Sequence, residues 1–571
     1  MSRTFARVGV VGLGIMGAGI VEVFARNRLG VVAVDVDAAA VDRGRRHVEH
    51  STRRAVQRGK LSAEDQADLL ARIEFTTDLH ALAAVDLVVE AVPERLEIKR
   101  SLFARLDEIC PADSVLATNT SSLSVTEIAV ATQRPGQVVG LHFFNPAPVM
   151  QLVEIVHSVA TEPQVMRDVE AFVRSMGKVG VTVGDRAGFI ANSLLFGYLN
   201  QAAAMYEAQV ATREDMDAAM TLGGGLPIGP LTLLDLIGLD TAVEILDTMY
   251  RQSRDCRHAA TPLLKQLVAA GRLGRKTGRG FYTYDRPGSP TLVADVSTPA
   301  PENAATGSAA GVRRIGVVGV GSLAAGIAEL GRRAGYDVVV VAWIPGNAGD
   351  AGDAGEAPHP HDLDALADCD VVIDAPVGDD GPHQRARFAA IDAGLKPGAL
   401  LATTTSSRPV IECAAATTRP GAVIGLHFLD AAPAGQLVEV VSTVSSTPAT
   451  EAVALDLVVR LGGHPVRCRD RAGFIVDALR FPYLNDAVKM LEANYASADD
   501  IDAAMRLGCG YPIGPVAALD EIGLDIALAI ERRLHLESSQ AALAPAPLLE
   551  QLVTAGRLGR RTGRGVRDYG G

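Results

Sequence analysis

The feature that most constrains the fold of this 571-residue chain is a repeat within its own sequence. The segment AGRLGRKTGRG at Ala270 to Gly280 returns almost unchanged as AGRLGRRTGRG at Ala555 to Gly565. DRAGFI at Asp185 returns at Asp470, and in both cases the offset is 285 positions. The units of a solenoid are only about 20 to 50 residues long. A period this large therefore indicates a duplicated multidomain unit.

Within each copy the sequence pattern changes near DRAGFI. Before it, short β-branched runs alternate with helical stretches, which predicts a Rossmann-type α/β domain with a parallel sheet of βαβ units. After it the signals are helical: Ile190 to Glu207 is long and apolar, and Thr212 with Asp215 resembles a capping box. A segment rich in Pro, Ala, Ser and Gly separates the copies. The predicted boundaries are 1–185 (Rossmann), 186–285 (helical), 286–312 (linker), 313–469 (Rossmann-type) and 470–571 (helical).

Charge and cysteine usage narrow the class of protein. A net charge of −13 and a pI near 5.5 argue against a nucleic-acid-binding surface as the main function. The N-terminus begins with a predicted strand, which leaves no room for a signal peptide, and no apolar run reaches the ~18 residues that span a bilayer. The six cysteines are scattered without C-x-x-C pairs or metal-ligand spacing. We expect a cytoplasmic protein without a membrane segment or a metal.

A dinucleotide-binding fingerprint opens the first copy. Gly12, Gly14 and Gly17 form G-x-G-x-x-G between a strand, Val8 to Val11, and an apolar helix. Such glycines allow a tight turn and let a pyrophosphate sit on the helix N-terminus. Asp35 ends the second strand eighteen residues later, where a carboxylate can bind the ribose hydroxyls. Because that carboxylate would repel a 2'-phosphate, NAD is favoured over NADP.

Four polar residues further along could surround one reacting carbon atom. Ser121 follows a strand, His142 closes the next one, Glu154 comes twelve positions later, and Asn192 lies near the start of the first helix of the second domain. Oxidising a secondary alcohol needs a base for the hydroxyl proton, and imidazole titrates near neutral pH. A carboxylate fixes the tautomer of the imidazole. Ser121 and Asn192 would stabilise charge on the substrate oxygen.

Several motifs in order resemble the L-3-hydroxyacyl-CoA dehydrogenases across residues 5 to about 284: GVVGLGIMGAGI, EAVPE with Lys99, NTSS, LHFFNP, LVEIV, DRAGFIANSLL, LGGGLPIGPLTLLDLIGLD and GRKTGRGFY. The resemblance implies NAD-dependent oxidation of (3S)-3-hydroxyacyl-CoA to 3-oxoacyl-CoA. It makes His142 the base, Glu154 its orienting partner, and Ser121 and Asn192 contacts of the reacting oxygen. It also implies cofactor contacts from the glycine loop with Ile15 and Met16, and from Asp35, Glu94, Lys99, Asn119, Asn145 and Lys276.

The resemblance further implies coenzyme A contacts from Ser51, Arg58 and Ser121. The insert from Ala38 to Leu61 agrees on physical grounds, because a polyphosphate ligand requires cations and this stretch is basic in an acidic chain. Its cationic residues are Arg43, Arg45, Arg46, Arg53, Arg54, Arg58 and Lys60.

The second copy departs from the first at its ligand positions. Its glycine motif ends in Ala324, and Ala342 stands where the first copy has Asp35. From Gly319 to Asp370 it is 23 residues shorter than the first copy is from Gly12 to Asp86. Ser406, His427 and Glu439 remain, but Thr404, Asp430 and Asp477 replace Asn119, Asn145 and Asn192. We expect weak NAD binding or none in this copy.

The helical domain of the second copy, in contrast, aligns with the first without a gap. Single-unit members of the family that the chain resembles dimerise through this domain. The resemblance thus implies an internal pseudo-dimer, with one working active site in copy one and copy two as scaffold; further self-association stays open. Two alternatives remain at this point: a non-catalytic nucleotide- or CoA-binding relative, and a dehydrogenase of a free hydroxy acid. Acyl-chain length and pathway are also open.

Overall fold

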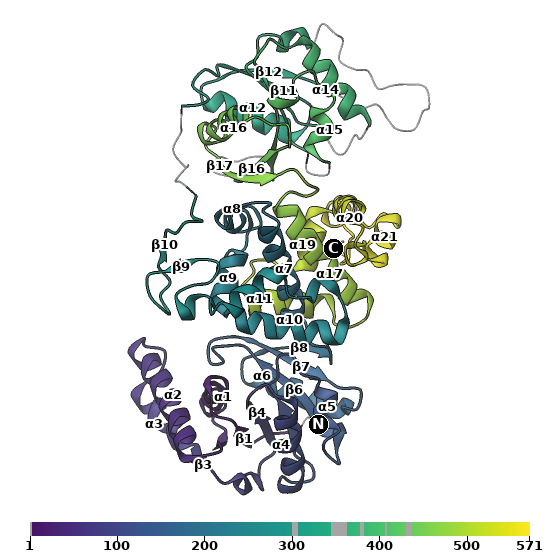
Figure 1. The fold of residues 1–571 in the computed structure, drawn as a ribbon. Helices are drawn as coiled ribbons and strands as arrows, with labels where there is room; N and C mark the ends of the chain where they lie inside the picture. Colours follow the sequence, from purple (N-terminus) through teal and green to yellow (C-terminus); the bar gives the residue numbers. More distant parts are fainter. Residues whose placement is uncertain are drawn as a thin grey trace.

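The computed structural model describes residues 3–299, 307–343, 363–376, 382–405, 408–429 and 437–570. It has three layers (Figure 1): the first Rossmann domain lies at one end, the second at the other, and the helices of both copies form the layer between them. The expected order of a Rossmann-type domain followed by a helical domain, occurring twice, is confirmed.

The first sheet has eight strands in the order β3-β2-β1-β4-β5-β6-β7-β8. Its inner strands are largely buried and rich in Val, Ile and Leu, as expected for a sheet covered on both faces, whereas the edge strands β3 and β8 are partly exposed. Neighbouring strands run parallel, except that β6 and β7 are antiparallel, a departure from the predicted parallel sheet. The strands are β1 (Arg7–Val11), β2 (Gly30–Val34), β3 (Ile73–Thr76), β4 (Leu87–Glu90), β5 (Val115–Thr118), β6 (Val138–Phe143), β7 (Leu152–His157) and β8 (Val179–Gly184).

Helices cover this sheet, and one pair extends beside it. The basic insert forms α2, which Asp37 caps at its start, and α3 follows it, capped by Ser62; each cap side chain accepts a backbone N–H. Figure 1 shows α2 and α3 as an arm next to α1. The helices are α1 (Ile15–Arg26), α2 (Ala38–Gln57), α3 (Ala63–Ala71), η1 (Leu79–Leu82), α4 (Leu96–Ile109), α5 (Val125–Ala129), η2 (Pro135–Gln137) and α6 (Pro163–Ser175).

The second sheet repeats this plan with seven strands in the order β12-β11-β13-β14-β15-β16-β17. Among its described residues it has no counterpart of β3. The sequence predicts that the basic insert is absent from this copy, and residues 344–362, where that shortening falls, lie outside the part that the structure describes. Its strands are β11 (Arg314–Val318), β12 (Asp337–Val341), β13 (Val371–Asp374), β14 (Leu400–Thr403), β15 (Val423–Phe428), β16 (Leu437–Ser442) and β17 (His464–Arg469). Its helices are α12 (Ser322–Arg333), η6 (Asp364–Leu366), α14 (Pro382–Gly394), α15 (Val410–Ala414), η7 (Pro420–Ala422) and α16 (Pro448–Arg460).

The middle layer contains two similar groups of helices. The first comprises α7 (Ala191–Glu207), α8 (Arg213–Ala218), η3 (Ala219–Gly223), α9 (Pro230–Ile237), α10 (Leu239–Ser253), η4 (Cys256–His258), α11 (Pro262–Ala269) and η5 (Arg275–Thr277). The second comprises α17 (Val476–Glu492), α18 (Ala498–Cys509), α19 (Pro515–Ile522), α20 (Leu524–Ser538), η8 (Ala541–Leu543), α21 (Pro547–Thr554) and η9 (Arg560–Thr562).

The two copies are joined through this layer. Helix α7 packs on α17, where the rings of Tyr198 and Tyr483 lie 6.4 Å apart. Arg257 of the first copy forms an ion pair with Asp486 of the second. Each helical group also reaches the Rossmann domain of the other copy: the Val210 carbonyl accepts the Arg469 N–H at 2.9 Å. The copies therefore share one interface within a single chain.

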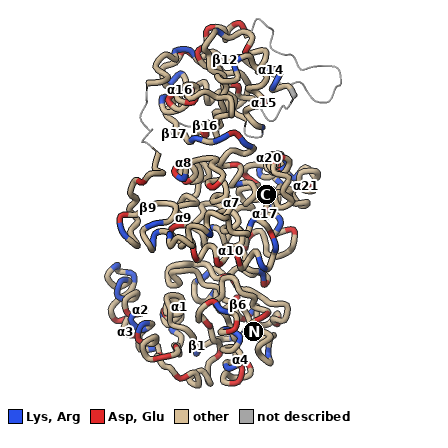
Figure 2. Tube along the Cα trace, viewed as in Figure 1, with Lys and Arg blue, Asp and Glu red and all other residues tan. Residues whose placement is uncertain are grey.

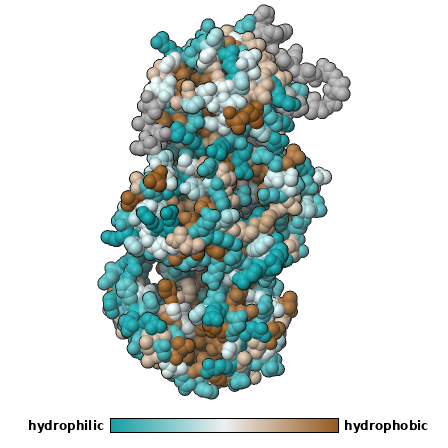
Figure 3. All heavy atoms as spheres, in the orientation of Figure 1, coloured by the Kyte–Doolittle hydropathy of each residue, from teal (hydrophilic) through white to brown (hydrophobic). Residues whose placement is uncertain are grey.

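Part of the predicted linker is folded onto the first helical group. β10 (Leu292–Val293) pairs with β9 (Thr283–Tyr284), and the Asp295 carboxylate binds the Arg213 guanidinium at 2.7 and 3.0 Å. Residues 300–306 of that linker lie outside the described residues. On the face shown in Figure 3, hydrophobic atoms form separate patches in a largely hydrophilic surface. Among the described residues, no helix combines the length and apolarity needed to cross a membrane.

Candidate active site

The antiparallel pairing of β6 with β7 explains the twelve-residue spacing of the catalytic candidates. In this register His142 lies directly opposite Glu154. The imidazole Nδ1 is 2.7 Å from Glu154 Oε2, and the carboxylate is fully buried. The other oxygen, Oε1, accepts the N–H groups of Ile190 and Ala191 at 3.0 and 2.9 Å, where α7 begins. One carboxylate thus ties the histidine to the helical domain.

This pairing fixes the chemistry of the imidazole. Because Nδ1 faces a carboxylate, it carries the proton in the neutral ring, and Nε2 is the basic nitrogen. The rings of Phe144 and Phe189 pack at 4.6 and 5.8 Å from the imidazole. Asn192 lies one residue beyond Ala191 in the first turn of α7. The site therefore places a base and an amide at the junction of the two domains.

Ser121 is positioned by Glu94. One carboxylate oxygen of Glu94 accepts the Thr120 hydroxyl at 2.6 Å and the Ser121 and Ser122 N–H groups at 2.9 and 3.2 Å. Burial alone would raise the pKa of Glu94, but the Lys99 ammonium and these donors outweigh it, so the pKa lies below its usual value. Glu94 is therefore ionised at neutral pH and holds the serine loop at the carboxyl edge of the sheet.

Two further predicted contact residues have structural partners here. Lys99 is fully buried, with Nζ 2.7 Å from Glu90 and 3.4 Å from Glu94, so it acts on the loop through Glu94. The Asn119 side-chain oxygen accepts the Phe143 N–H at 2.8 Å and ties the end of β5 to β6. Both residues order the strand ends around the site, and their expected contacts with the cofactor stay predictions.

The glycine loop has the geometry that a dinucleotide needs. Gly12 has φ +92°, and a Cβ there would meet the Ala91 carbonyl at 2.7 Å. A Cβ at Gly17 would lie 1.7 Å from the Gly12 oxygen, whereas at Gly14 it would meet open space. Within residues 3–299, no side chain caps the first turn of α1. Its N–H groups and the opening at Gly14 therefore suit a pyrophosphate.

Asp35 is anchored beside that loop. Its carboxylate accepts the Leu13 N–H at 2.8 Å and the Val36 N–H at 2.7 Å. The residue is half-buried and directly follows β2, the strand that pairs with β1 before the loop. It can thus present an oriented acceptor to ribose hydroxyls, which supports the preference for NAD.

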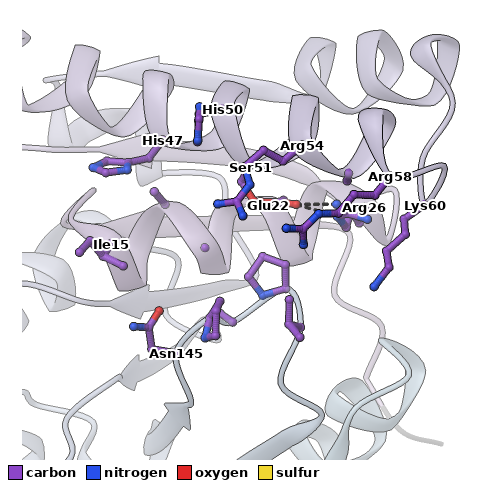
Figure 4. A pocket seen from close by; sticks show the side chains of 17 residues that line it. Ile15, Glu22, Arg26, His47, His50, Ser51, Arg54, Arg58, Lys60 and Asn145 are labelled. Atoms are coloured by element: carbon purple, nitrogen blue, oxygen red, sulfur yellow. Dashed lines mark hydrogen bonds and ion pairs between the residues drawn. The ribbon is translucent and has the colours of Figure 1, made fainter. Parts of the chain in front are cut away.

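A cleft of about 460 Å³ lies between α1, α2 and the loop 145–149, and Figure 4 shows it from close by. Ile15, Ser51, Arg58 and Asn145 all line it, so the structure brings these four predicted contacts together. The sequence reasoning missed His47 and His50, which line the cleft from α2. Their spacing to residues 51, 54 and 58 follows one helix face and would have revealed them.

The basic character of this cleft comes from several elements. Besides Arg58, the cations Arg26, Arg54 and Lys60 line it, and Figure 2 shows Lys and Arg along α2. Arg45, in contrast, stacks on the Phe75 ring at 4.7 Å and does not line the cleft. The insert is therefore two-faced: one face is available to an anionic ligand and the other packs on the domain.

Two further predicted cofactor contacts are Lys276 and Met16. Lys276 is in η5 of the helical layer, where its ammonium binds Asp240 at 2.5 and 2.7 Å. Within residues 3–299, none of its hydrogen bonds or ion pairs reaches the glycine loop. Met16 is half-buried in the first turn of α1. Their expected contacts with the cofactor stay predictions.

The second copy keeps the pair but changes what surrounds it. His427 Nδ1 is 2.6 Å from Glu439, whose other oxygen accepts the Ile475 and Val476 N–H groups. Burial lowers the pKa of His427, but Glu439 and Asp477 outweigh it and the pKa is raised. Asp477 thus adds a second negative charge beside this histidine, where the first copy has the neutral Asn192. Ser406 and Asp430 lie outside the described residues.

The nucleotide end of the second copy is also altered. Ala342 offers no carboxylate, and Trp343 beside it packs against Arg387 at 5.5 Å from its ring. Arg387 forms a fully buried ion pair with Asp374 at 2.7 Å, at the end of β13. Side chains of the domain itself thus pack where β12 and β13 end.

Fold and site together define an NAD-dependent dehydrogenase that acts on an alcohol. Two family models match the chain twice: "3-hydroxyacyl-CoA dehydrogenase, NAD binding domain" at residues 7–186 and 353–471, and "3-hydroxyacyl-CoA dehydrogenase, C-terminal domain" at 188–284 and 473–569. The chain belongs to the 3-hydroxyacyl-CoA dehydrogenase family. In the second copy the NAD-domain match begins only after β12, so it omits the altered nucleotide loop.

The chain is similar both to relatives that span its two copies and to relatives that span one copy. The 3-hydroxyadipyl-CoA dehydrogenase of Escherichia coli is 32% identical over 95% of this chain and 96% of its own. The 3-hydroxybutyryl-CoA dehydrogenase of Mycobacterium tuberculosis is 44% identical over 50% of this chain and all of its own. A crystal structure of 3-hydroxybutyryl-CoA dehydrogenase from Escherichia coli has a TM-score of 0.72, with 30% identity over 97% of this chain and all of that one. The tandem arrangement therefore occurs in a related protein.

Proposed function

We propose that the first copy oxidises a short-chain (3S)-3-hydroxyacyl-CoA to the 3-oxoacyl-CoA, reversibly, with His142 as general base. The observation that carries this proposal is the His142–Glu154 pair, which is fixed by backbone N–H groups of the helical domain. Bound NAD supplies the acceptor for the hydride that leaves C3. His142 Nε2 takes the hydroxyl proton, and Glu154 stabilises the imidazolium that forms.

The remaining polar residues would bind and orient the substrate. Ser121, held by Glu94, and Asn192 would donate hydrogen bonds to the C3 oxygen. The cations of the α2 cleft would bind the phosphates of coenzyme A, with Ser51 and Arg58 among the contacts. We also place the reaction in the cytoplasm, on the composition of the chain and its free cysteines.

The test is turnover with matched substrates. The full chain should reduce acetoacetyl-CoA with NADH, and His142→Asn should lose ~10²-fold or more in kcat. Failure of the wild-type chain to turn over any 3-oxoacyl-CoA would favour a non-catalytic binding protein. Activity on free acetoacetate at a similar kcat/KM would favour a hydroxy-acid dehydrogenase.

The relatives' names suggest two candidate substrates. The relative that spans both copies is named for 3-hydroxyadipyl-CoA, and the single-copy relatives are named for 3-hydroxybutyryl-CoA. Rates across a series of chain lengths, with and without an ω-carboxylate, decide between them. A higher kcat/KM for the carboxylated substrates would place this chain with the former.

A further inference from the structure

We infer that the second copy forms part of the first active site, with Gly508 as a positioning residue for His142. This inference rests on the proposed function, because it takes His142 to be the base. Gly508 lies in the last turn of α18, more than 350 positions after His142 in the sequence. Helix α18 packs on β7, the strand that carries Glu154, and on β8 of the first Rossmann domain.

The contact is closest at two side chains that flank the catalytic pair. A Cβ at Gly508 would lie 2.8 Å from Leu152 Cδ2, and 3.2 and 3.4 Å from Phe144 Cε1 and Cζ. Phe144 is two residues past His142, and its ring packs on the imidazole at 4.6 Å. Because Gly508 has no side chain, the Phe144 ring has space to pack against His142.

Two other residues of the second copy, Tyr495 and Cys509, lie near the strands that carry the catalytic pair. Tyr495 is buried, and its ring would lie 3.1 Å from a Cβ at Gly184, the last residue of β8; the Arg186 guanidinium is 4.7 Å from the same ring. Cys509 has a pKa raised to about 12, by burial first and then by the nearby Glu154 carboxylate. Residues of copy two therefore lie close to Glu154 as well as to Phe144.

The reverse contact provides a matched control. Gly223 of the first copy is the counterpart of Gly508, and a Cβ there would meet Leu429 and Leu437 of the second copy, Leu437 at 2.8 Å. Leu429 stands where the first copy has Phe144. Crowding at Gly223 is at least as severe, but it acts on the copy whose ligand positions have changed. Only crowding at Gly508 reaches His142.

The test compares Gly508→Ala with Gly223→Ala in the full chain. A side chain at 508 would push Phe144 toward the imidazole, and misplacing a catalytic group by about 1 Å costs up to ~10²-fold. Gly508→Ala should lower kcat by ~10-fold, with the KM of both substrates changed less than about twofold. Gly223→Ala should leave kcat within about twofold at a similar loss in Tm.

Two further readouts separate positioning from general damage. Because a closer phenyl ring desolvates the imidazolium, the His142 limb of the kcat–pH profile should move to lower pH in Gly508→Ala. Adding Phe144→Leu should relieve the crowding and recover part of the lost kcat. If Gly508→Ala does not fold, Phe144→Leu alone should still shift that limb.

Equal kcat losses in the two alanine variants, or an unshifted profile, would overturn the inference. An active His142→Asn variant would instead overturn the proposed function. If His142→Asn is inactive and Gly508→Ala is fully active, the inference is wrong and the proposed function still holds.

Discussion

At the scale of single residues, Glu154 connects the two domains of the first copy. Its two oxygens are shared between the His142 ring and two backbone N–H groups of α7, so removing its charge affects both orientation and the stability of the imidazolium. Since the carboxylate is fully buried, no water replaces those interactions.

We predict that Glu154→Gln lowers kcat by ~10²-fold or more, because the amide cannot stabilise the imidazolium. Steady-state turnover of acetoacetyl-CoA with NADH measures this effect. Glu439→Gln is the matched control in the second copy, since Glu439 has the same partners there. A comparable loss of kcat in Glu439→Gln would show that both pairs contribute to turnover.

At the scale of elements, the arginines of helix α2 and its C-cap differ in whether they line the cleft. Arg58 and Arg54 line the cleft, whereas Arg53 is exposed and does not line it. Charge-assisted contacts to phosphate are stronger than neutral ones and weaken with salt.

We therefore predict that Arg58→Ala together with Arg54→Ala raises the KM for acyl-CoA by ~10-fold, equivalent to roughly 1.4 kcal/mol of binding. The KM for NADH should change little. Arg53→Ala should leave both constants within about twofold. If the KM for acyl-CoA is unchanged in the double variant, the cleft does not bind coenzyme A.

How much of these elements the sequence could reveal depends on the range of the interactions. The His142–Glu154 pair and Asp35 follow from local spacing, because strand register and the βαβ turn place them. The roles of Lys99 and Glu94 depend on contacts between β4, α4 and the loop after β5, which no local pattern encodes. The antiparallel β7 was likewise not predicted, since a short apolar run does not show its direction.

At the scale of the whole molecule, the interface between the copies contains a buried acid. Glu531 of α20 is 1% exposed, and neither carboxylate oxygen has a hydrogen-bond partner among the described residues. Asp486, Lys489 and Arg257 are the charged groups that act on it. Burial, and then the Asp486 charge, raises its pKa from 4.5 to about 8.

The sign of the pH dependence follows from that shift. Between about pH 4.5 and 8 the folded chain binds a proton that the unfolded chain releases, so stability falls as pH rises through this window. We predict that Glu531→Gln raises Tm at pH 8.5 by ~2 °C more than at pH 5. Calorimetry measures this difference, with the exposed Glu521→Gln as control. An equal change at both pH values would contradict the raised pKa.

Contacts between the copies are also what sequence reasoning could not place. The repeat predicts that the helical domains pair, but it does not show which residue of copy two touches which strand of copy one. Gly508 and Phe144 are separated by more than 360 positions, and only packing brings them together. Duplication thus leaves the second copy with altered ligand positions and an intact contact surface.

The central claim is that the chain has one working site, in the first copy, and the paired variants His142→Ala and His427→Ala test it most directly. Turnover of 3-oxoacyl-CoA and the number of NADH molecules bound per chain are measured for each. We predict one NADH per chain, a kcat reduced by ~10²-fold or more in His142→Ala, and a kcat within about twofold of wild type in His427→Ala. Two bound NADH per chain, or a substantial loss of turnover in His427→Ala alone, would contradict the account.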